Sequence, residues 1–149
     1  MNVSDFRKSI KLSSKLFIEG KEFTIRQIVK FRFDDGSIYF KLFLNDGYVF
    51  ADDSNENIYL LVKEVQTSFS LPFPEELYYD GKHFGFSYEA HAVAEEFWGE
   101  EIFKKGDAEK FSDYKANDGE SYLSLGVRDD GEKLDFYGKI VIPNEVMIS

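Results

Sequence analysis

Cysteine is absent from the 149-residue chain, and this absence excludes several classes of chemistry. Disulfides, thiolate zinc sites, cysteine-ligated iron–sulfur clusters and thiol catalysis all require it. Histidine is nearly absent as well, with only His83 and His91. Their spacing puts them roughly 26 Å apart on a strand or about 12 Å apart on a helix. Neither distance lets two imidazoles reach one ion without a sharp reversal between them, so we predict no metal site. No cofactor-binding motif is present either, so we predict no cofactor.

Long apolar runs are also missing. No stretch approaches the roughly 18 apolar residues of a membrane span, and the segment MNVSDFRKSIKLSSKLF lacks the apolar core of a signal peptide. We therefore expect a cytoplasmic protein without membrane insertion. The sequence contains no Gly-rich phosphate loop, nucleophile elbow or dinucleotide-binding fingerprint, which favours a non-enzymatic role and leaves enzyme activity open.

Positive charge is scarce relative to negative charge. The chain has 28 acidic and 18 basic residues, a formal net charge of -10. This balance argues against direct nucleic-acid binding and against docking on an anionic membrane. The acids are spread along the chain, which favours solubility as their role. The alternative is an acidic surface that meets a basic partner or acts as a decoy for a nucleic-acid-binding protein.

Aromatic residues are abundant, at 17% of the chain, and they suit half-buried strands. The length fits a single domain over residues 1–149. Pro72 and Pro74 lie in QTSFSLPFPEEL, where no central strand can run. We expect residues 66–77 to form a crossover, either between two halves, 1–65 and 78–149, or from one sheet to another.

Residues 22–50 give the clearest pattern in the chain. They predict three antiparallel strands with turns at 34–37 and 45–47, where Asp, Asn and Gly favour tight reversal. Apolar and polar residues alternate along the first of these strands, which predicts one dry and one wet face. The dry face holds Phe23, Ile25, Val29, Phe31 and Phe33, and the wet face holds Thr24, Arg26, Lys30 and Arg32.

Further strands are expected at 15–18, 58–65, 122–127, 133–142 and 145–148, with a short helix from about Ser4. Residues 88–98 allow either a strand or a helix, and their alternation favours a strand to about Glu95. The fold class is therefore all-β and mainly antiparallel. We expect a sandwich or a partly open barrel built from meanders, with at most one or two short helices.

One group of side chains is a candidate contact site for a ligand or partner. Aromatic residues with polar handles favour ligand walls and interfaces. A carboxylate beside a Trp has its pKa raised by desolvation, which would suit acid–base chemistry. The alternative is ordinary core packing with a solvated acidic rim. The candidates are Trp98, Phe97, Tyr78, Tyr79, Glu95 and Glu96.

Two segments carry a resemblance to a known family. GKEFTIRQIVKFRFDDGSIYFKLFLNDGYVFADD and YLSLGVRDDGEKLDFYGKIVIPNEV resemble an uncharacterised bacterial family catalogued as domain of unknown function 4178. The usual Trp of the second strand is missing, and Ile28 replaces a glycine. The resemblance implies an accessory role linked to envelope stress or membrane remodelling; the family has no established activity to transfer to this chain. It depends on Gly20, Ile25, Phe40, Leu44, Gly47, Phe50, Gly131-Glu132, Tyr137-Gly138 and Val141.

Three functions follow from these observations as hypotheses. The first is a non-enzymatic module that binds a protein partner, because aromatic content and acidity are high and catalytic motifs are missing. The second is a small-molecule-binding or carboxylate-based hydrolytic β-barrel. The third is the acidic decoy. A homodimer is a further alternative, since unpaired strand edges seek partners.

Overall fold

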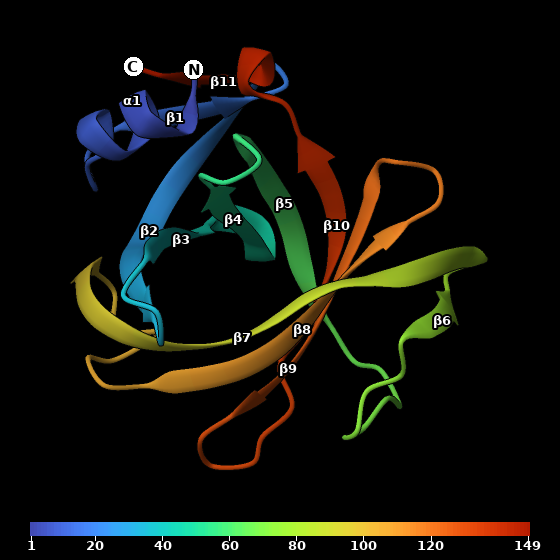
Figure 1. The fold of residues 1–149 in the computed structure, drawn as a ribbon. Coiled ribbons are helices and arrows are strands. Elements are labelled where there is room, and N and C mark those ends of the chain that lie inside the picture. The colour runs from blue at the N-terminus through green and yellow to red at the C-terminus, as the bar shows by residue number, and fades with distance from the viewer.

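The computed structural model describes residues 1–149 and is all-β, with eleven antiparallel strands and one short helix (Figure 1). The strands are β1 (Lys15–Ile18), β2 (Lys21–Phe33), β3 (Ile38–Leu44), β4 (Tyr48–Asp53), β5 (Ile58–Val65), β6 (Glu76–Tyr79), β7 (Lys82–Gly99), β8 (Ala108–Ala116), β9 (Ser121–Arg128), β10 (Asp135–Val141) and β11 (Val146–Ile148); the helix is α1 (Val3–Ser9). No helix has the length and apolar character needed to cross a bilayer.

Eight of the strands close into a barrel. The sheet runs β11-β1-β2-β3-β4-β5-β10-β9-β8-β7-β6, and a further pairing of β2 with β7 joins its two sides. The expected sandwich is therefore wrong, and the expected partly open barrel is closed. Each half of the chain supplies one four-stranded meander, β2–β5 or β7–β10. Pairing of β5 with β10 and of β2 with β7 joins them, so closure depends on contacts distant in sequence.

The meander over 22–50 is confirmed, and so is the strand over 58–65. Residues 88–98 belong to β7, which extends to Gly99, beyond the expected end near Glu95. The crossover 66–77 is irregular until β6 begins at Glu76. Helix α1 is capped by the Asn2 side chain, which accepts a hydrogen bond from the Asp5 amide, so the expected start at Ser4 is two residues late.

A bulge in β2 changes which face its side chains occupy. The register shifts between Ile25 and Gln27. Residues Phe23 and Ile25 consequently pack in an outer cluster, whereas Val29 and Phe31 point into the barrel. The four polar residues of the expected wet face are exposed or half-buried, as the alternation predicted. The expected single dry face is wrong, because a bulge reverses the parity of the residues that follow it.

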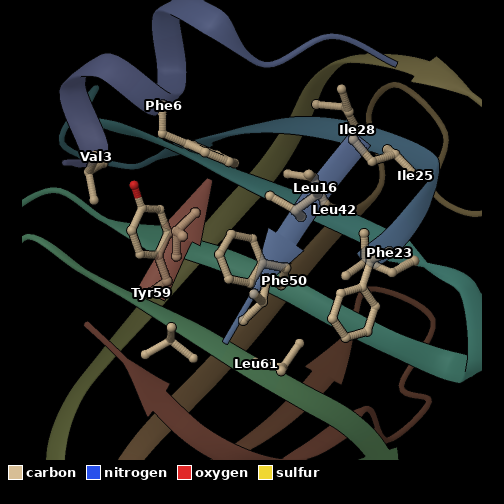
Figure 2. Close-up of a cluster of buried hydrophobic side chains, with 14 residues drawn as sticks. Val3, Phe6, Leu16, Phe23, Ile25, Ile28, Leu42, Phe50, Tyr59 and Leu61 are labelled. Atoms are coloured by element: carbon tan, nitrogen blue, oxygen red, sulfur yellow. The ribbon is translucent and has the colours of Figure 1, made fainter. Parts of the chain in front are cut away.

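The outer face of the first meander is covered by α1, which lies across it with β1 and β11 (Figure 1). Phe6 of α1 packs edge-on against Phe50 and Tyr59, with ring centroids 5.8 Å and 5.3 Å away (Figure 2). Arg7 of α1 forms a two-point ion pair with the buried Asp52 of β4, both oxygens at 2.8 Å. The strands of this meander are thus buried on both faces, which leaves their inner face for the barrel interior.

The outer face of the second meander carries a smaller cluster. Leu77, Phe84, Tyr114, Leu123 and Leu125 are among its buried members. The crossover and β6 cover this cluster. The carbonyl of Pro74 in the crossover accepts a hydrogen bond from the Tyr114 hydroxyl of β8. The crossover therefore packs down on the barrel wall and does not obstruct the interior.

Candidate functional site: the barrel cavity

The interior of the barrel contains a cavity of about 570 Å³. Inward-facing side chains of both meanders line it, and strand alternation explains the selection. On β8, Glu109, Phe111 and Asp113 line the cavity, whereas Tyr114, the residue after Asp113, packs outside. Apolar walls come from Phe33, Tyr39, Val49, Ala51, Leu60, Val62, Ala90, Phe111 and Phe136.

One end of the cavity is bordered by loops and is the mouth of the site. The mouth consists of the β2–β3 turn (Asp34, Asp35, Ser37), the β4–β5 loop (Asp53, Ser54, Asn55, Glu56) and the part of β7 that passes them (Ser87, Tyr88, Glu89, Ala90, His91). Most of these residues are exposed. The structure therefore provides an access route bordered by polar side chains.

The β7–β8 loop packs into the interior of the barrel beside Gln27 of β2. Phe103 of this loop is buried against Phe31 and Phe43, with ring centroids 5.4 Å and 5.6 Å away. Gln27 of β2 fixes the loop with two hydrogen bonds. Its Nε2 donates to the Phe103 carbonyl at 2.7 Å, and its Oε1 accepts from the Phe103 amide at 3.0 Å. Because Gln27 is fully buried, these bonds satisfy an amide that would otherwise be costly.

A buried ion pair lies at the inner wall of the cavity. Lys41 Nζ donates to Glu109 Oε1 at 3.2 Å, and the Tyr39 hydroxyl donates to the same oxygen at 2.9 Å. The ammonium also lies over the rings of Phe136 and Phe103, 4.4 Å and 5.3 Å from their centroids. Charge pairing and aromatic faces together stabilise a desolvated cation. The Glu109 carboxylate is therefore balanced within the protein.

Asp113 is the second buried carboxylate of the cavity wall, and it is not balanced. It is 3% exposed, and the Tyr122 hydroxyl donates a hydrogen bond to its Oδ2. Its Oδ1 has no hydrogen-bond partner, and no basic side chain pairs with it. Burial raises the pKa of the Asp113 carboxyl to about 6, although the hydroxyls of Ser124, Tyr122 and Tyr88 act in the opposite direction. An unpaired buried carboxylate oxygen is uncommon and requires an explanation.

The arrangement can hold a small molecule by shape and fix it by polar contacts. Ligand pockets of this size are lined mainly by apolar and aromatic side chains with a few convergent polar groups. Here the polar groups that face the interior include the hydroxyls of Tyr39 and Tyr122, the Lys41–Glu109 pair and Asp113. Burial raises the pKa of both tyrosines, so the phenols stay protonated and act as donors.

None of the six candidate residues from the sequence lines this cavity. Trp98 points outward and is 42% exposed, whereas its neighbour Phe97 packs against the buried cluster that contains Val29 and Phe31. Glu95 is bound by Arg32 on the barrel exterior, with a shortest distance of 2.8 Å. Those hydrogen bonds lower the pKa of Glu95, so the expectation of a raised pKa there is wrong. Glu96 is exposed on the same strand.

Tyr78 and Tyr79 lie on β6, which pairs with the first residues of β7, whereas the other four candidates lie near the far end of that strand. Tyr78 is 76% exposed beside His83, with ring centroids 5.0 Å apart. Tyr79 packs against Tyr137 at the same separation. The structure therefore separates the six candidates into at least two places. A role of these residues in binding a partner stays a prediction.

Sequence reasoning missed the residues of the cavity, and one signal could have found them. Lys41 shares a strand face with Tyr39 and Phe43, and a charged residue between aromatic neighbours of the same parity indicates a buried, paired side chain. Glu109, Phe111 and Asp113 likewise share one parity. The second pattern is hard to recognise, because residues 100–114 are rich in charged side chains and look like a solvated segment.

Comparisons with family models, with curated proteins and with solved structures found no match to this chain. The resemblance to the family of unknown function therefore stays a prediction and carries no argument about the site. The two histidines have different partners: His91 Nδ1 lies 2.9 Å from Asp34 Oδ1 at the mouth, and His83 lies near Glu76.

Proposed function

We propose that this barrel binds an organic small molecule with an apolar body inside its cavity. The observation that supports the proposal is the cavity itself, about 570 Å³ with aromatic and aliphatic walls and buried polar groups that converge on it. That volume lies within the range of roughly 300 to 1,000 Å³ found for ligand pockets.

A packing defect is a poor explanation of the cavity. Protein interiors are close-packed, and voids larger than a water molecule are few. The outer cluster under α1 follows that rule, with stacked and edge-on contacts between Phe6, Phe50 and Tyr59. The same strands therefore pack tightly on one face and leave a ligand-sized space on the other. This contrast within one sheet supports a binding role.

The test uses N-phenyl-1-naphthylamine, an uncharged aromatic probe at neutral pH whose fluorescence rises in apolar surroundings. We expect saturable binding at one site per chain. The variant Ala51→Phe adds a phenyl group to the cavity wall and should abolish binding or weaken it at least tenfold. The matched control Thr24→Phe adds the same group at an exposed position of β2 and should bind as the original protein does.

Absence of saturable binding by the original protein would overturn the proposal, and so would equal binding by Ala51→Phe. Urea unfolding of both variants separates a lost site from a lost fold.

The protein-binding role, a basic partner, a homodimer, the acidic decoy and a cytoplasmic location stay predictions from the sequence. The hydrolytic alternative also stays a prediction. In the cavity, Lys41 and Tyr39 both donate to Oε1 of Glu109, which favours a structural role for that carboxylate. The size and lining of the cavity support ligand binding directly, so ligand binding is the function that we propose.

A further inference from the structure

We infer that the ligand of the cavity is an organic cation, a protonated amine on an apolar body, whose N–H group donates to Oδ1 of Asp113. The inference deepens the proposed function and rests on it. It gives the chemical class of the ligand, which the shape of the cavity alone does not.

The hydrogen bonds inside the barrel favour a ligand that donates to Asp113. Asp113 faces the interior, because it pairs in register with Tyr88 of β7 and Ser124 of β9, which also line the cavity. Tyr122 already donates to Oδ2, and Oδ1 is left as an acceptor without a donor. A ligand that donates a hydrogen bond completes this carboxylate. A ligand with only acceptor atoms leaves it unpaired, and this is costly in a buried site.

The excess of negative charge around the cavity favours a cationic ligand. The residues that line the cavity and its mouth include eight acidic side chains and two basic ones, a far stronger imbalance than the 28 to 18 of the whole chain. Both basic side chains are already paired, Arg7 with Asp52 and Lys41 with Glu109. Four acidic residues have no basic partner: Asp35, Asp53, Glu89 and Asp113.

These unpaired carboxylates are arranged from the mouth to the interior. Asp35, Asp53 and Glu89 belong to three different segments of the mouth, and Asp113 lies inside. Low-dielectric walls lined by one sign of charge concentrate ligands of the opposite sign. Fatty acids and other anionic ligands are repelled along the whole route. The interior moreover shows that it can hold an ammonium, because Lys41 Nζ rests against the ring of Phe136.

The test compares ligands that share a body and differ in charge. Tryptamine, tryptophol and indole-3-propionate supply a cation, an uncharged alcohol and an anion; octylamine and octanol repeat the comparison on a flexible chain. Titration calorimetry at pH 7.5 and low salt should show each amine binding about tenfold or more tightly than its alcohol, as expected for a hydrogen bond to a charged group. The anion should not bind measurably.

The variant Asp113→Asn keeps the size of the side chain and removes its charge. The ratio of amine to alcohol affinity should fall to within about twofold of unity. The matched control Asp129→Asn changes an exposed carboxylate outside the cavity and should keep the preference. Circular dichroism confirms that both variants are folded.

Equal affinities for amine and alcohol in both pairs would overturn the inference, and so would an amine preference that survives Asp113→Asn. If the uncharged naphthylamine probe still binds in those cases, the proposed small-molecule site stands and only the cation is wrong. If neither that probe nor any of these ligands binds, both proposals fail.

Discussion

Replacing Asp113 by Asn should stabilise the protein at neutral pH and leave its stability nearly unchanged in acid. The reason is the cost of an unpaired buried charge. Burial raises the pKa of this carboxyl from its ordinary value of 3.8 to about 6 in the folded protein. Each unit of difference between the folded and unfolded states corresponds to about 1.4 kcal/mol, so ionised Asp113 destabilises the fold by about 3 kcal/mol.

The direction in which the free energy of unfolding changes with pH depends on whether the folded or the unfolded state binds more protons. Below pH 3.8 the carboxyl is protonated in both states and imposes no penalty. Between pH 3.8 and 6 the unfolded chain loses this proton first, so the contribution of Asp113 to the free energy of unfolding decreases as the pH rises. Above pH 6 the full penalty is present. Asparagine does not titrate, so the variant escapes the penalty.

The assay is urea unfolding of both proteins at intervals from pH 3.5 to pH 8. The free energy of unfolding of Asp113→Asn minus that of the original protein should increase by about 3 kcal/mol across this range. Other groups titrate alike in both proteins and largely cancel in the difference. The groups that face Asp113 are Tyr88 of β7, Tyr122 and Ser124 of β9, and Glu109 on its own strand. A difference that is flat with pH, or that decreases, would refute the reasoning.

Three further predictions concern other parts of the barrel. Gly138→Ala should destabilise the protein by about 3 kcal/mol or more in thermal unfolding, because a Cβ there would lie 2.1 Å from the Leu61 carbonyl oxygen of β5. The control Gly85→Ala should be nearly neutral, because open space surrounds that position. Gln27→Ala should cost about 2 kcal/mol and speed amide exchange at Phe103, measured by mass spectrometry, since two buried hydrogen bonds are lost; unchanged exchange would contradict this role. Asp118→Asn should destabilise the protein at pH 7 and not near pH 2. Hydrogen bonds from the backbone amide and hydroxyl of Ser121 lower the pKa of Asp118 to about 2, so the ionised carboxylate stabilises the fold only above that pH. Equal loss of stability at both pH values would contradict this prediction.

The strands could be predicted from the sequence because their signals are local. Asp-Asp-Gly and Asn-Asp-Gly favour tight turns wherever they occur, and the alternation between them needs only neighbouring residues. The limits of β1 and β5 agree with the expectation to the residue. A dense run such as IYLLVKEV predicts a strand whatever lies beside it.

Closure of the barrel could not be predicted, because it depends on pairs that lie far apart in the chain. Val29 pairs with Phe97, and Val62 pairs with Gly138. Nothing local in either segment indicates its partner. The bulge after Ile25 adds a second difficulty, because it moves residues of one parity to different faces. The sequence therefore indicated a β-sheet protein without showing which apolar residues point inward.

The candidate site could not be found for the same physical reason. Trp98 and its neighbouring glutamates attract attention in the sequence, yet an outward position on a barrel strand leaves them in solvent. Glu109 and Asp113 look like members of a charged segment. Their significance depends on Lys41, 68 residues from Glu109 along the chain, and on its absence from Asp113.

The difference between these two carboxylates is the strongest indication of function in the molecule. Both face the same interior from the same strand, so both experience desolvation. Glu109 is balanced by an ammonium and a phenol, as a structural carboxylate of a stable core has to be. Asp113 keeps one oxygen unpaired, and burial of its ionised carboxyl costs about 3 kcal/mol, which an amide or apolar side chain would avoid. A fold that optimised stability alone would not retain it, since such exceptions concentrate at functional sites. A ligand whose N–H group donates to Oδ1 pairs this buried carboxylate, so the residue that destabilises the fold contributes to the affinity of the site.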